Sequence, residues 1–318
     1  MTTPPYIGRF APSPTGPLHA GSLLAAMASY LDAKACGGQW LVRIEDIDEA
    51  RTVAGADRHI LHTLHQFGMH WDGEVVWQTQ RKALYERASA QLGNHIYACG
   101  CTRREIADSR CGIARDGAVI YPGTCRNGLA AGRTVRSYRL RVPETGQAGE
   151  LIAFEDDWLG PFQRNLATEA GDFVLKRADG FWAYQLAVVV DDADQHVSHV
   201  VRGADLLDST PRQIYLQRLL RLPTPHYLHV PVVTNELGEK LSKQTGAQAL
   251  RTDQPLVALS EAARFLGLGL AAANNIDAFW RAAIPAWRNL RVSRPAGLAI
   301  QNPATKFIDE IAPATVHS

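Results

Sequence analysis

The sequence predicts an α/β fold built around a parallel β-sheet, and three observations support this prediction. The first is a strand, a proline-rich loop and a helix in direct succession, with the strand at Tyr6–Ala11 and the helix at about Leu18–Ala35. The second is another apolar run, Gln39–Asp46, which follows that helix. The third is the return of buried, apolar runs from Phe173 onward. Parallel strands need crossover connections, so a strand–helix–strand order favours a parallel sheet.

Helical periodicity indicates two more helices, and an irregular segment then interrupts the pattern. We expect helices over Ala54–Phe67 and Thr79–Leu92, with "GMHWDG" as the turn between them. From Tyr97 to about Asp172 the chain holds four of its five cysteines, many glycines and short strand-like pieces. This change in composition and in apolar pattern predicts an insertion within the sheet domain.

After the insertion, the apolar pattern predicts the second half of the sheet domain and a helical C-terminal part. We expect buried strands over Phe173–Gly203, a helix over Ala204–Leu222, one more strand beginning at Tyr227, and helices beyond Gln248. The predicted domains are 1–96 and 173–248 for the two halves of the sheet domain, 97–172 for the insertion and 249–318 for a short helical subdomain.

The composition is that of an ordinary globular protein, with 46% hydrophobic and 20% charged residues and a net charge of +1. Such a balance gives no overall basic excess, although a local basic face can still bind nucleic acid. No apolar run approaches the roughly 20 residues that a membrane span needs. The N-terminus also lacks the features of a signal peptide, so we expect a cytoplasmic protein.

In the stretch from Arg9 to Ala35, a histidine, His19, lies between the proline-rich loop and the start of the predicted helix. A helix N-terminus suits a phosphate because its N–H groups are unpaired and its end carries partial positive charge. His19 can donate a hydrogen bond there, and Gly21 allows a ribose or base to approach the backbone. The alternative is that both are ordinary residues of a helix start.

A second stretch, "NELGEKLSKQTG", places Lys240 and Lys243 on either side of Ser242. Two lysines at this spacing can follow the charge of a triphosphate as pyrophosphate leaves. Taken by itself, this stretch is better explained as a solvated basic turn.

Together the two stretches resemble the signature motifs of a known family. "SPTGPLHAGSL" resembles the HIGH motif and "KLSKQ" the KMSKS motif of class I aminoacyl-tRNA synthetases, and "RIEDID" and "VVVDDADQHVSHVVRGADLL" resemble the glutamyl-tRNA synthetase group. Ser22, Leu241 and Gln244 depart mildly from these motifs. The resemblance implies a Rossmann-like fold, use of ATP with Mg²⁺, catalytic roles for His19, Lys240 and Lys243, and ATP contacts from His19, Gly21, Ser22 and Lys243.

The same group implies an amino-acid substrate with two carboxylates. Glu45 has the charge to bind an α-ammonium, and Arg9 and Arg202 can form forked pairs with carboxylates. The alternative for Arg9 and Glu45 is a structural ion pair, and we expect Asp191 and Asp192 to brace a turn. The resemblance assigns glutamate contacts to six positions: Arg9, Ala11, Ser13, Glu45, Tyr184 and Arg202.

The clustered cysteines predict one structural zinc site in the insertion. Cys99, Cys101, Cys111 and Cys125 all lie there, and incidental buried thiols are the alternative. The resemblance implies the pattern C-x-C and Y-x-x-x-C instead, which gives the ligands Cys99, Cys101, Tyr121 and Cys125. On ligand chemistry Cys111 is the competing fourth ligand.

Only 75 residues follow Lys243, so we expect no anticodon-binding domain after it. This matches the short synthetase-like family of glutamyl-queuosine tRNA(Asp) synthetases. The resemblance implies that the enzyme activates L-glutamate without tRNA and transfers it to queuosine in tRNA(Asp). Nothing in the sequence suggests an obligate dimer, so we expect a monomer. The alternatives are a truncated glutamyl-tRNA synthetase that charges an acceptor end, and an inactive paralogue that binds RNA or amino acid.

Overall fold

The structure is a computed structural model, and it describes residues 5–109, 111–114, 117–232 and 249–293. The chain begins with the predicted strand, loop and helix, β1 (Ile7–Phe10) and α1 (Ala20–Ala35). The strand β2 (Gln39–Ile44) pairs in parallel with β1, and the short strand β3 (Val76–Trp77) pairs in parallel with β2. The predicted parallel sheet is therefore confirmed in its first half.

Strands from the second half of the chain extend this arrangement. Their order is β7-β6-β10-β9, and β9, β10 and β6 run parallel, whereas β7 is antiparallel to β6. The helix α7 (Thr210–Leu220) connects β9 to β10 after a 3₁₀ turn, η4 (Ala204–Ser209). The strand bounds are β6 (Leu151–Asp156), β7 (Gly160–Asn165), β9 (His199–Gly203) and β10 (His226–Val230).

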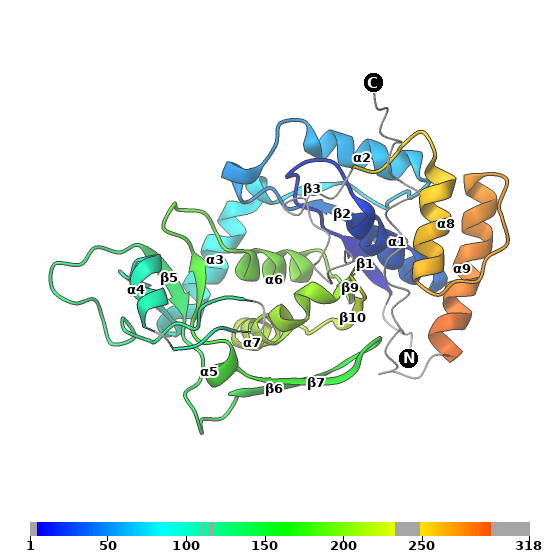
Figure 1. Cartoon of the computed structure of the whole chain (residues 1–318). Coiled ribbons are helices and arrows are strands. Elements are labelled where there is room, and N and C mark those ends of the chain that lie inside the picture. Colours follow the sequence, from blue (N-terminus) through cyan, green and yellow to red (C-terminus); the bar gives the residue numbers. More distant parts are fainter. Residues whose placement is uncertain (1–4, 110, 115–116, 233–248, 294–318) are drawn as a thin grey trace.

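The two groups of strands meet between β1 and the start of β9. Ser198, just before β9, donates its backbone N–H to the carbonyl of Ile7 at 2.9 Å, and its hydroxyl accepts the Ile7 N–H at 2.9 Å. From here β2 and β3 extend in one direction, and β10 and β6 extend in the other (Figure 1). In open α/β sheets such a reversal of strand order opens a crevice at the carboxyl ends of the strands.

Apolar side chains on both faces of the sheet form two cores. Alternate residues of β9 and β10 point to opposite faces, so Val201 and Leu228 pack with α1, whereas Val200 and Tyr227 pack with the helices of the other face. The helices of the first face are α1, α2 (Ala56–Gln66), α8 (Pro255–Phe265) and α9 (Ile276–Ser293). Those of the second face are α3 (Lys82–Leu92), α6 (Tyr184–Asp194) and α7.

The helices α8 and α9 lie beside α1, at the opposite end of the molecule from α4 (Figure 1). Trp287 of α9 donates its indole N–H to Asp32 of α1 at 2.8 Å, and Trp280 donates to the carbonyl of Phe67 at 2.9 Å. Both indoles are buried. The prediction of helices beyond Gln248 is therefore confirmed for α8 and α9.

None of the described helices is long and apolar enough to span a membrane.

The segment predicted as an insertion contributes β5 and most of β4 to an antiparallel three-stranded sheet of order β4-β5-β8, and β8 follows directly after the segment. Its β6 returns to the main sheet and pairs with β10, with Asp156 opposite Tyr227. The short helix α4 projects away from the main sheet (Figure 1). The remaining bounds are β4 (Ile96–Cys99), α4 (Arg103–Asp108), β5 (Ser137–Leu140), α5 (Leu166–Glu169) and β8 (Phe173–Lys176), with 3₁₀ turns η1 (Glu49–Arg51), η2 (Gln78–Arg81) and η3 (Gly93–His95).

One predicted strand is wrong, and short strands such as β3 were not predicted. Tyr184–Asp194, expected within a run of buried strands, is the helix α6. Its residues Leu186 to Asp192 are all buried, so the run shows no polar face and no helical period, and valines favour strands locally. The strand β3 is only two residues long and follows the predicted turn, so it carries no alternating pattern.

Candidate active site and metal centre

A cavity of about 460 Å³ lies at the carboxyl ends of β1 and β9, where the strand order reverses. Such a volume accommodates a small ligand. All six residues predicted to contact glutamate line it, although they come from four separate segments of the chain. The lining residues are Arg9, Phe10, Ala11, Ser13, Ala25, Glu45, Arg51, Tyr184, Val201, Arg202 and Leu206.

Arg9, on β1, is held by a carboxylate of the helix α6. Its Nε donates to Asp192 at 3.1 Å, and the same Asp192 oxygen lies 2.8 Å from Nη1 of Arg43. Arg43 in turn contacts Glu45 at 3.1 Å, and it is completely buried. Arg9 and Glu45 are therefore connected through Arg43 and Asp192, and they do not form the direct ion pair that was the alternative.

Burial and neighbouring charge have opposite effects on the two carboxyl groups of this network. Burial raises the pKa of Glu45 above its usual value, although Arg43 and Arg9 oppose the rise. Burial opposes ionisation of Asp192 as well, but Arg9 and Arg43 together hold its pKa below the usual value. Asp192 is thus a fixed counter-charge for the arginines, whereas Glu45 gains most from an added cation such as an ammonium group.

Arg202, on β9, differs from the other two arginines because all its partners are neutral. Its Nη1 donates to the hydroxyl of Tyr184 at 3.2 Å, its Nη2 donates to the hydroxyl of Thr210 at 2.7 Å, and its Nε lies 3.1 Å from Nε2 of His229. Arg202 is 5% exposed, and no carboxylate among the described residues forms an ion pair with it. A buried guanidinium with uncompensated charge favours an anionic ligand group.

The sequence did not identify Arg43 as a site residue, and it misplaced two acids. Asp191 and Asp192, expected to brace a turn, lie inside α6. Asp191 accepts hydrogen bonds from Gln78 at 2.8 Å, Arg81 at 2.7 Å and Tyr85 at 2.8 Å. The one available signal was an arginine within the apolar strand "QWLVRIED", because a charge in a buried strand needs a partner.

His19 begins α1 as its N-cap residue, as the strand–loop–helix pattern predicts. Its Nδ1 accepts the N–H of Gly21 at 3.2 Å, and the hydroxyl of Ser22 accepts the N–H of His19 at 2.7 Å. An imidazole that accepts at Nδ1 carries its proton on Nε2 when neutral, so Nε2 is a hydrogen-bond donor. These contacts explain how the helix begins, and the roles of His19, Gly21 and Ser22 in ATP binding stay predictions. Lys240 and Lys243 lie outside the described residues.

The three cysteines Cys99, Cys101 and Cys125 form a cluster whose sulfur atoms lie within 4.8 Å of one another. The Tyr121 hydroxyl completes the cluster, at 3.4 Å from the sulfur of Cys99 and 3.5 Å from that of Cys101. The sulfurs of Cys101 and Cys125 are 3.6 Å apart. A tetrahedral zinc ion with bonds of about 2.3 Å to sulfur and 2.0 Å to oxygen requires S···S edges of about 3.8 Å and O···S edges of about 3.5 Å.

These distances fit a closed zinc site with three sulfur ligands and one oxygen ligand. Cys111 is exposed and lies outside the cluster, with its sulfur 3.8 Å from the carbonyl of Ser109. Arg139 adds positive charge beside the thiols, because its Nε donates to the Cys99 sulfur at 3.4 Å and its guanidinium stacks 4.0 Å from the Tyr121 ring centre. The geometry therefore favours Tyr121 over Cys111 as the fourth ligand.

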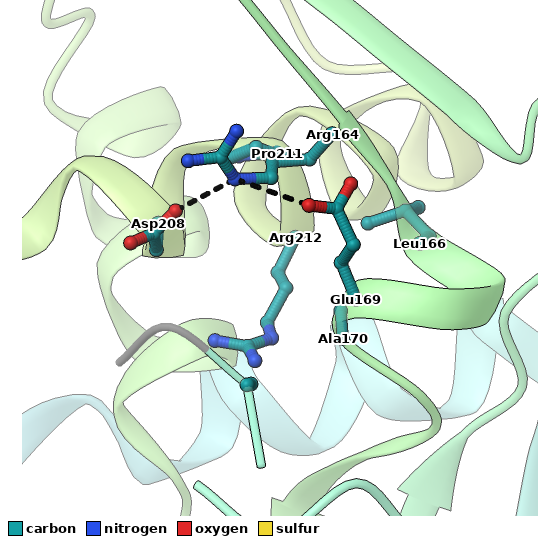
Figure 2. Close-up of a pocket in the computed structure, with 8 residues that line it drawn as sticks. Arg164, Leu166, Glu169, Ala170, Asp208, Pro211 and Arg212 are labelled. Carbon is teal, nitrogen blue, oxygen red and sulfur yellow. Dashed lines mark hydrogen bonds and ion pairs between the residues drawn. The ribbon is translucent and has the colours of Figure 1, made fainter. Parts of the chain in front are cut away.

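A second cavity, between α5 and the start of α7, has no room for a substrate (Figure 2). Figure 2 shows Arg164 between two carboxylates, and its Nε lies 2.8 Å from Asp208 and 3.9 Å from Glu169. The volume is about 10 Å³, which is at most enough for one water molecule. The cavity therefore lies beside an ion-paired contact that joins Arg164 of β7 to Asp208 of η4 and Glu169 of α5.

The fold and the site define a class I tRNA synthetase catalytic domain. Residues 7–277 match the family model described as "tRNA synthetases class I (E and Q), catalytic domain". The fold is also similar to the crystal structure of a glutamate–tRNA synthetase from Elizabethkingia anophelis, with a TM-score of 0.71 and 26% identity. That similarity covers 87% of this chain, which spans 65% of the length of the solved protein.

Similarity to curated proteins identifies the family within this class. The chain is 69% identical to the glutamyl-Q tRNA(Asp) synthetase of Janthinobacterium sp. (strain Marseille), over 89% of this chain and 96% of that protein. It is 65% identical to the glutamyl-Q tRNA(Asp) synthetase of Verminephrobacter eiseniae (strain EF01-2), over 91% of this chain and 99% of that protein. The chain belongs to the glutamyl-Q tRNA(Asp) synthetase family, which confirms the resemblance found in its motifs.

Proposed function

We propose that this protein activates L-glutamate with ATP and transfers the glutamate to the queuosine base in the anticodon of tRNA(Asp). In the first step a glutamate carboxylate oxygen attacks the α-phosphorus of ATP, and the bond to the leaving pyrophosphate breaks. In the second step a hydroxyl of the cyclopentenediol ring attacks the carbonyl carbon of glutamyl-adenylate, and AMP leaves. The names of relatives at 60 to 69% identity support the choice of acceptor.

The main structural support for glutamate as the substrate is the arrangement of charged residues that line the cavity. Glu45 supplies a buried carboxylate for the α-ammonium, and Arg202 supplies a buried guanidinium without a charged partner. Arg9 provides a second cationic wall, although Asp192 offsets part of its charge. A ligand with one ammonium and two carboxylates complements this set, and Ser13 and Tyr184 add neutral hydroxyl groups.

The start of α1 is the proposed position of the ATP phosphates. Helix N–H groups and the Nε2 donor of His19 offer hydrogen bonds there, and Gly21 leaves space for the nucleotide. Mg²⁺ accompanies ATP in this proposal, and Lys240 and Lys243 stabilise charge on the transferred phosphorus. The enzyme then needs no covalent nucleophile, because orientation and charge neutralisation lower the barrier.

The metal site has a structural role in this proposal. Cys99, Cys101, Tyr121 and Cys125 hold one zinc ion, which fastens β4 to the segment that follows α4. In this proposal the enzyme acts as a monomer. The cytoplasm is the proposed location because ATP and tRNA are found there.

The test of the proposal measures attachment of labelled glutamate, with ATP, to two tRNA(Asp) preparations that differ only in queuosine. We expect labelling of the queuosine-containing tRNA alone, together with glutamate-dependent ATP–pyrophosphate exchange in the absence of tRNA. Equal labelling of both preparations, or labelling of tRNA(Glu), would support a truncated glutamyl-tRNA synthetase. Absence of both labelling and exchange would support an inactive binding protein.

A further inference from the structure

Arg202 is oriented by a chain of buried polar groups that begins on another strand. The chain runs from Asp156, at the end of β6, through His229 on β10 to Arg202 on β9. Nδ1 of His229 lies 2.6 Å from Oδ2 of Asp156, and Nε2 of His229 lies 3.1 Å from Nε of Arg202. Asp156 and His229 are completely buried, and neither lines the cavity.

The geometry fixes the protonation of the His229 ring. A guanidinium nitrogen has only donors, so Nε2 of His229 must accept the Arg202 N–H and carries no proton. The single ring proton is then on Nδ1, where it is donated to the carboxylate of Asp156. His229 is therefore a neutral imidazole, and it presents a lone pair to Arg202 without cancelling the charge of the guanidinium.

The carboxylate of Asp156 is itself held by the backbone. Its Oδ1 accepts three N–H groups, from Trp158 at 3.0 Å, from Leu159 at 2.8 Å and from His229 at 3.3 Å. Only Oδ2 faces the imidazole. Both the position of Asp156 and the oxygen that it offers to His229 are thus determined by the turn after β6.

We infer that Asp156 and His229 are positioning residues for glutamate, because they aim the Arg202 guanidinium at the substrate carboxylate while leaving its charge uncompensated. The inference rests on the proposed function for the identity of the ligand. A direct carboxylate partner would orient Arg202 equally well, as Asp192 orients Arg9. It would also compete with the substrate carboxylate for the same guanidinium.

Replacement of Asp156 by asparagine tests this relationship with almost no change of shape. The three N–H groups at Oδ1 keep the amide oxygen at that position, so the amide NH₂ faces Nδ1 of His229. The ring proton then moves to Nε2, where it points at the Arg202 N–H and displaces the guanidinium. Loss of the aspartate charge alone would have the opposite effect, because it makes the surroundings of Arg202 more positive and strengthens carboxylate binding. The direction of the change therefore separates the two roles.

The experiment measures ATP–pyrophosphate exchange by the full chain while glutamate and ATP are varied in turn. For Asp156→Asn we expect the KM for glutamate to rise about tenfold or more, which is the size of a lost hydrogen bond to a charged group. The KM for ATP and the kcat stay unchanged. The matched control is Asp172→Asn, which removes an equally buried carboxylate that pairs with Arg126 at 2.6 Å in the insertion.

A lower or unchanged KM for glutamate in Asp156→Asn would overturn the inference, as would an equal rise in Asp172→Asn. Failure of the proposed function would be distinguishable from failure of this inference, because the unaltered protein itself would then show no glutamate-dependent ATP–pyrophosphate exchange. A second measurement needs neither a variant nor activity. Nitrogen-15 NMR of histidine-labelled protein should show His229 with its proton on Nδ1, and a proton on Nε2 in the unaltered protein would exclude the arrangement.

Discussion

The hydroxyl oxygen of Tyr121 lies 3.4 Å from the sulfur of Cys99, at the O···S spacing of a tetrahedral zinc site. The same oxygen accepts the backbone N–H of Cys125 at 2.9 Å. Tyr121 is only 5% exposed, and the Arg139 guanidinium covers one face of its ring. Positive charge beside a phenol favours the oxygen as an anionic ligand when a metal ion is bound.

Replacement of Tyr121 by phenylalanine should therefore weaken zinc binding, whereas Cys111→Ser should not. Loss of a group that only supports a ligand costs about 10- to 100-fold in metal affinity, and loss of a ligand should exceed that. Competition with a chromophoric chelator measures the affinities of both variants. Full zinc affinity in Tyr121→Phe, with loss in Cys111→Ser, would make Cys111 the fourth ligand.

Removal of zinc should loosen the insertion and leave the glutamate cavity intact. The proposed ligands come from β4, from the residue pair after it and from the segment that follows α4, whereas the cavity is lined mainly by residues of β1, β9 and the ends of β2 and α6. Because a structural metal contributes its binding energy to folding, a chelator should lower the melting temperature. ATP–pyrophosphate exchange below that temperature should persist. An immediate loss of exchange on chelation would show that the metal also supports the adenylation site.

Asp192→Asn should destabilise the protein strongly, because the carboxylate balances two buried arginines. Breaking a buried ion pair costs about 3 to 5 kcal/mol. A matched control lies on the same helix, since Asp194 is about half exposed and pairs with Arg81 at 2.5 Å. Asp194→Asn should cost no more than about 1 kcal/mol. Urea unfolding of both variants measures the difference, and equal losses would show that the Arg9–Asp192–Arg43 network adds little.

Stability should fall as the pH decreases below about 6.5, the ordinary value for an imidazole. Burial and the nearby Arg202 lower the pKa of His229, although Asp156 opposes them. The folded protein thus binds fewer protons than the unfolded chain in this range, and acid favours unfolding, by at most about 1.4 kcal/mol per pH unit for one such group.

Urea unfolding at pH 7.5 and pH 5 measures this dependence, and a His229→Gln variant identifies the contribution of that ring. His199 acts with the same sign, because burial and the neighbouring His226 lower its pKa, so part of the dependence should remain in the variant. An unchanged slope in His229→Gln would mean that the ring titrates equally in the folded and unfolded states.

The sequence predicted the parts of the site that are local in the chain. A strand, a rigid loop and a helix placed His19 at a helix N-terminus, and the motifs led to six of the eleven residues that line the cavity. Contacts between distant segments gave no such signal. Asp156 and His229 are 73 residues apart, and α6 has no polar face to reveal its helical period. Arg43 was missed because its partners Asp191 and Asp192 come from that same misassigned helix.

His19→Asn separates the capping role that the structure shows for this side chain from its proposed role toward ATP. Asparagine is as good an N-cap as any residue, so the start of α1 and the melting temperature should be preserved. The shorter side chain loses the Nε2 donor, and loss of one hydrogen bond to a developing charge lowers kcat by about 10²- to 10³-fold. Exchange kinetics at saturating glutamate measure the effect. Ser22→Ala is the comparison, since it removes the other half of the capping box, and it should lower stability by about 1 kcal/mol with a smaller effect on kcat. Equal kcat in His19→Asn and the unaltered protein would limit His19 to its capping role.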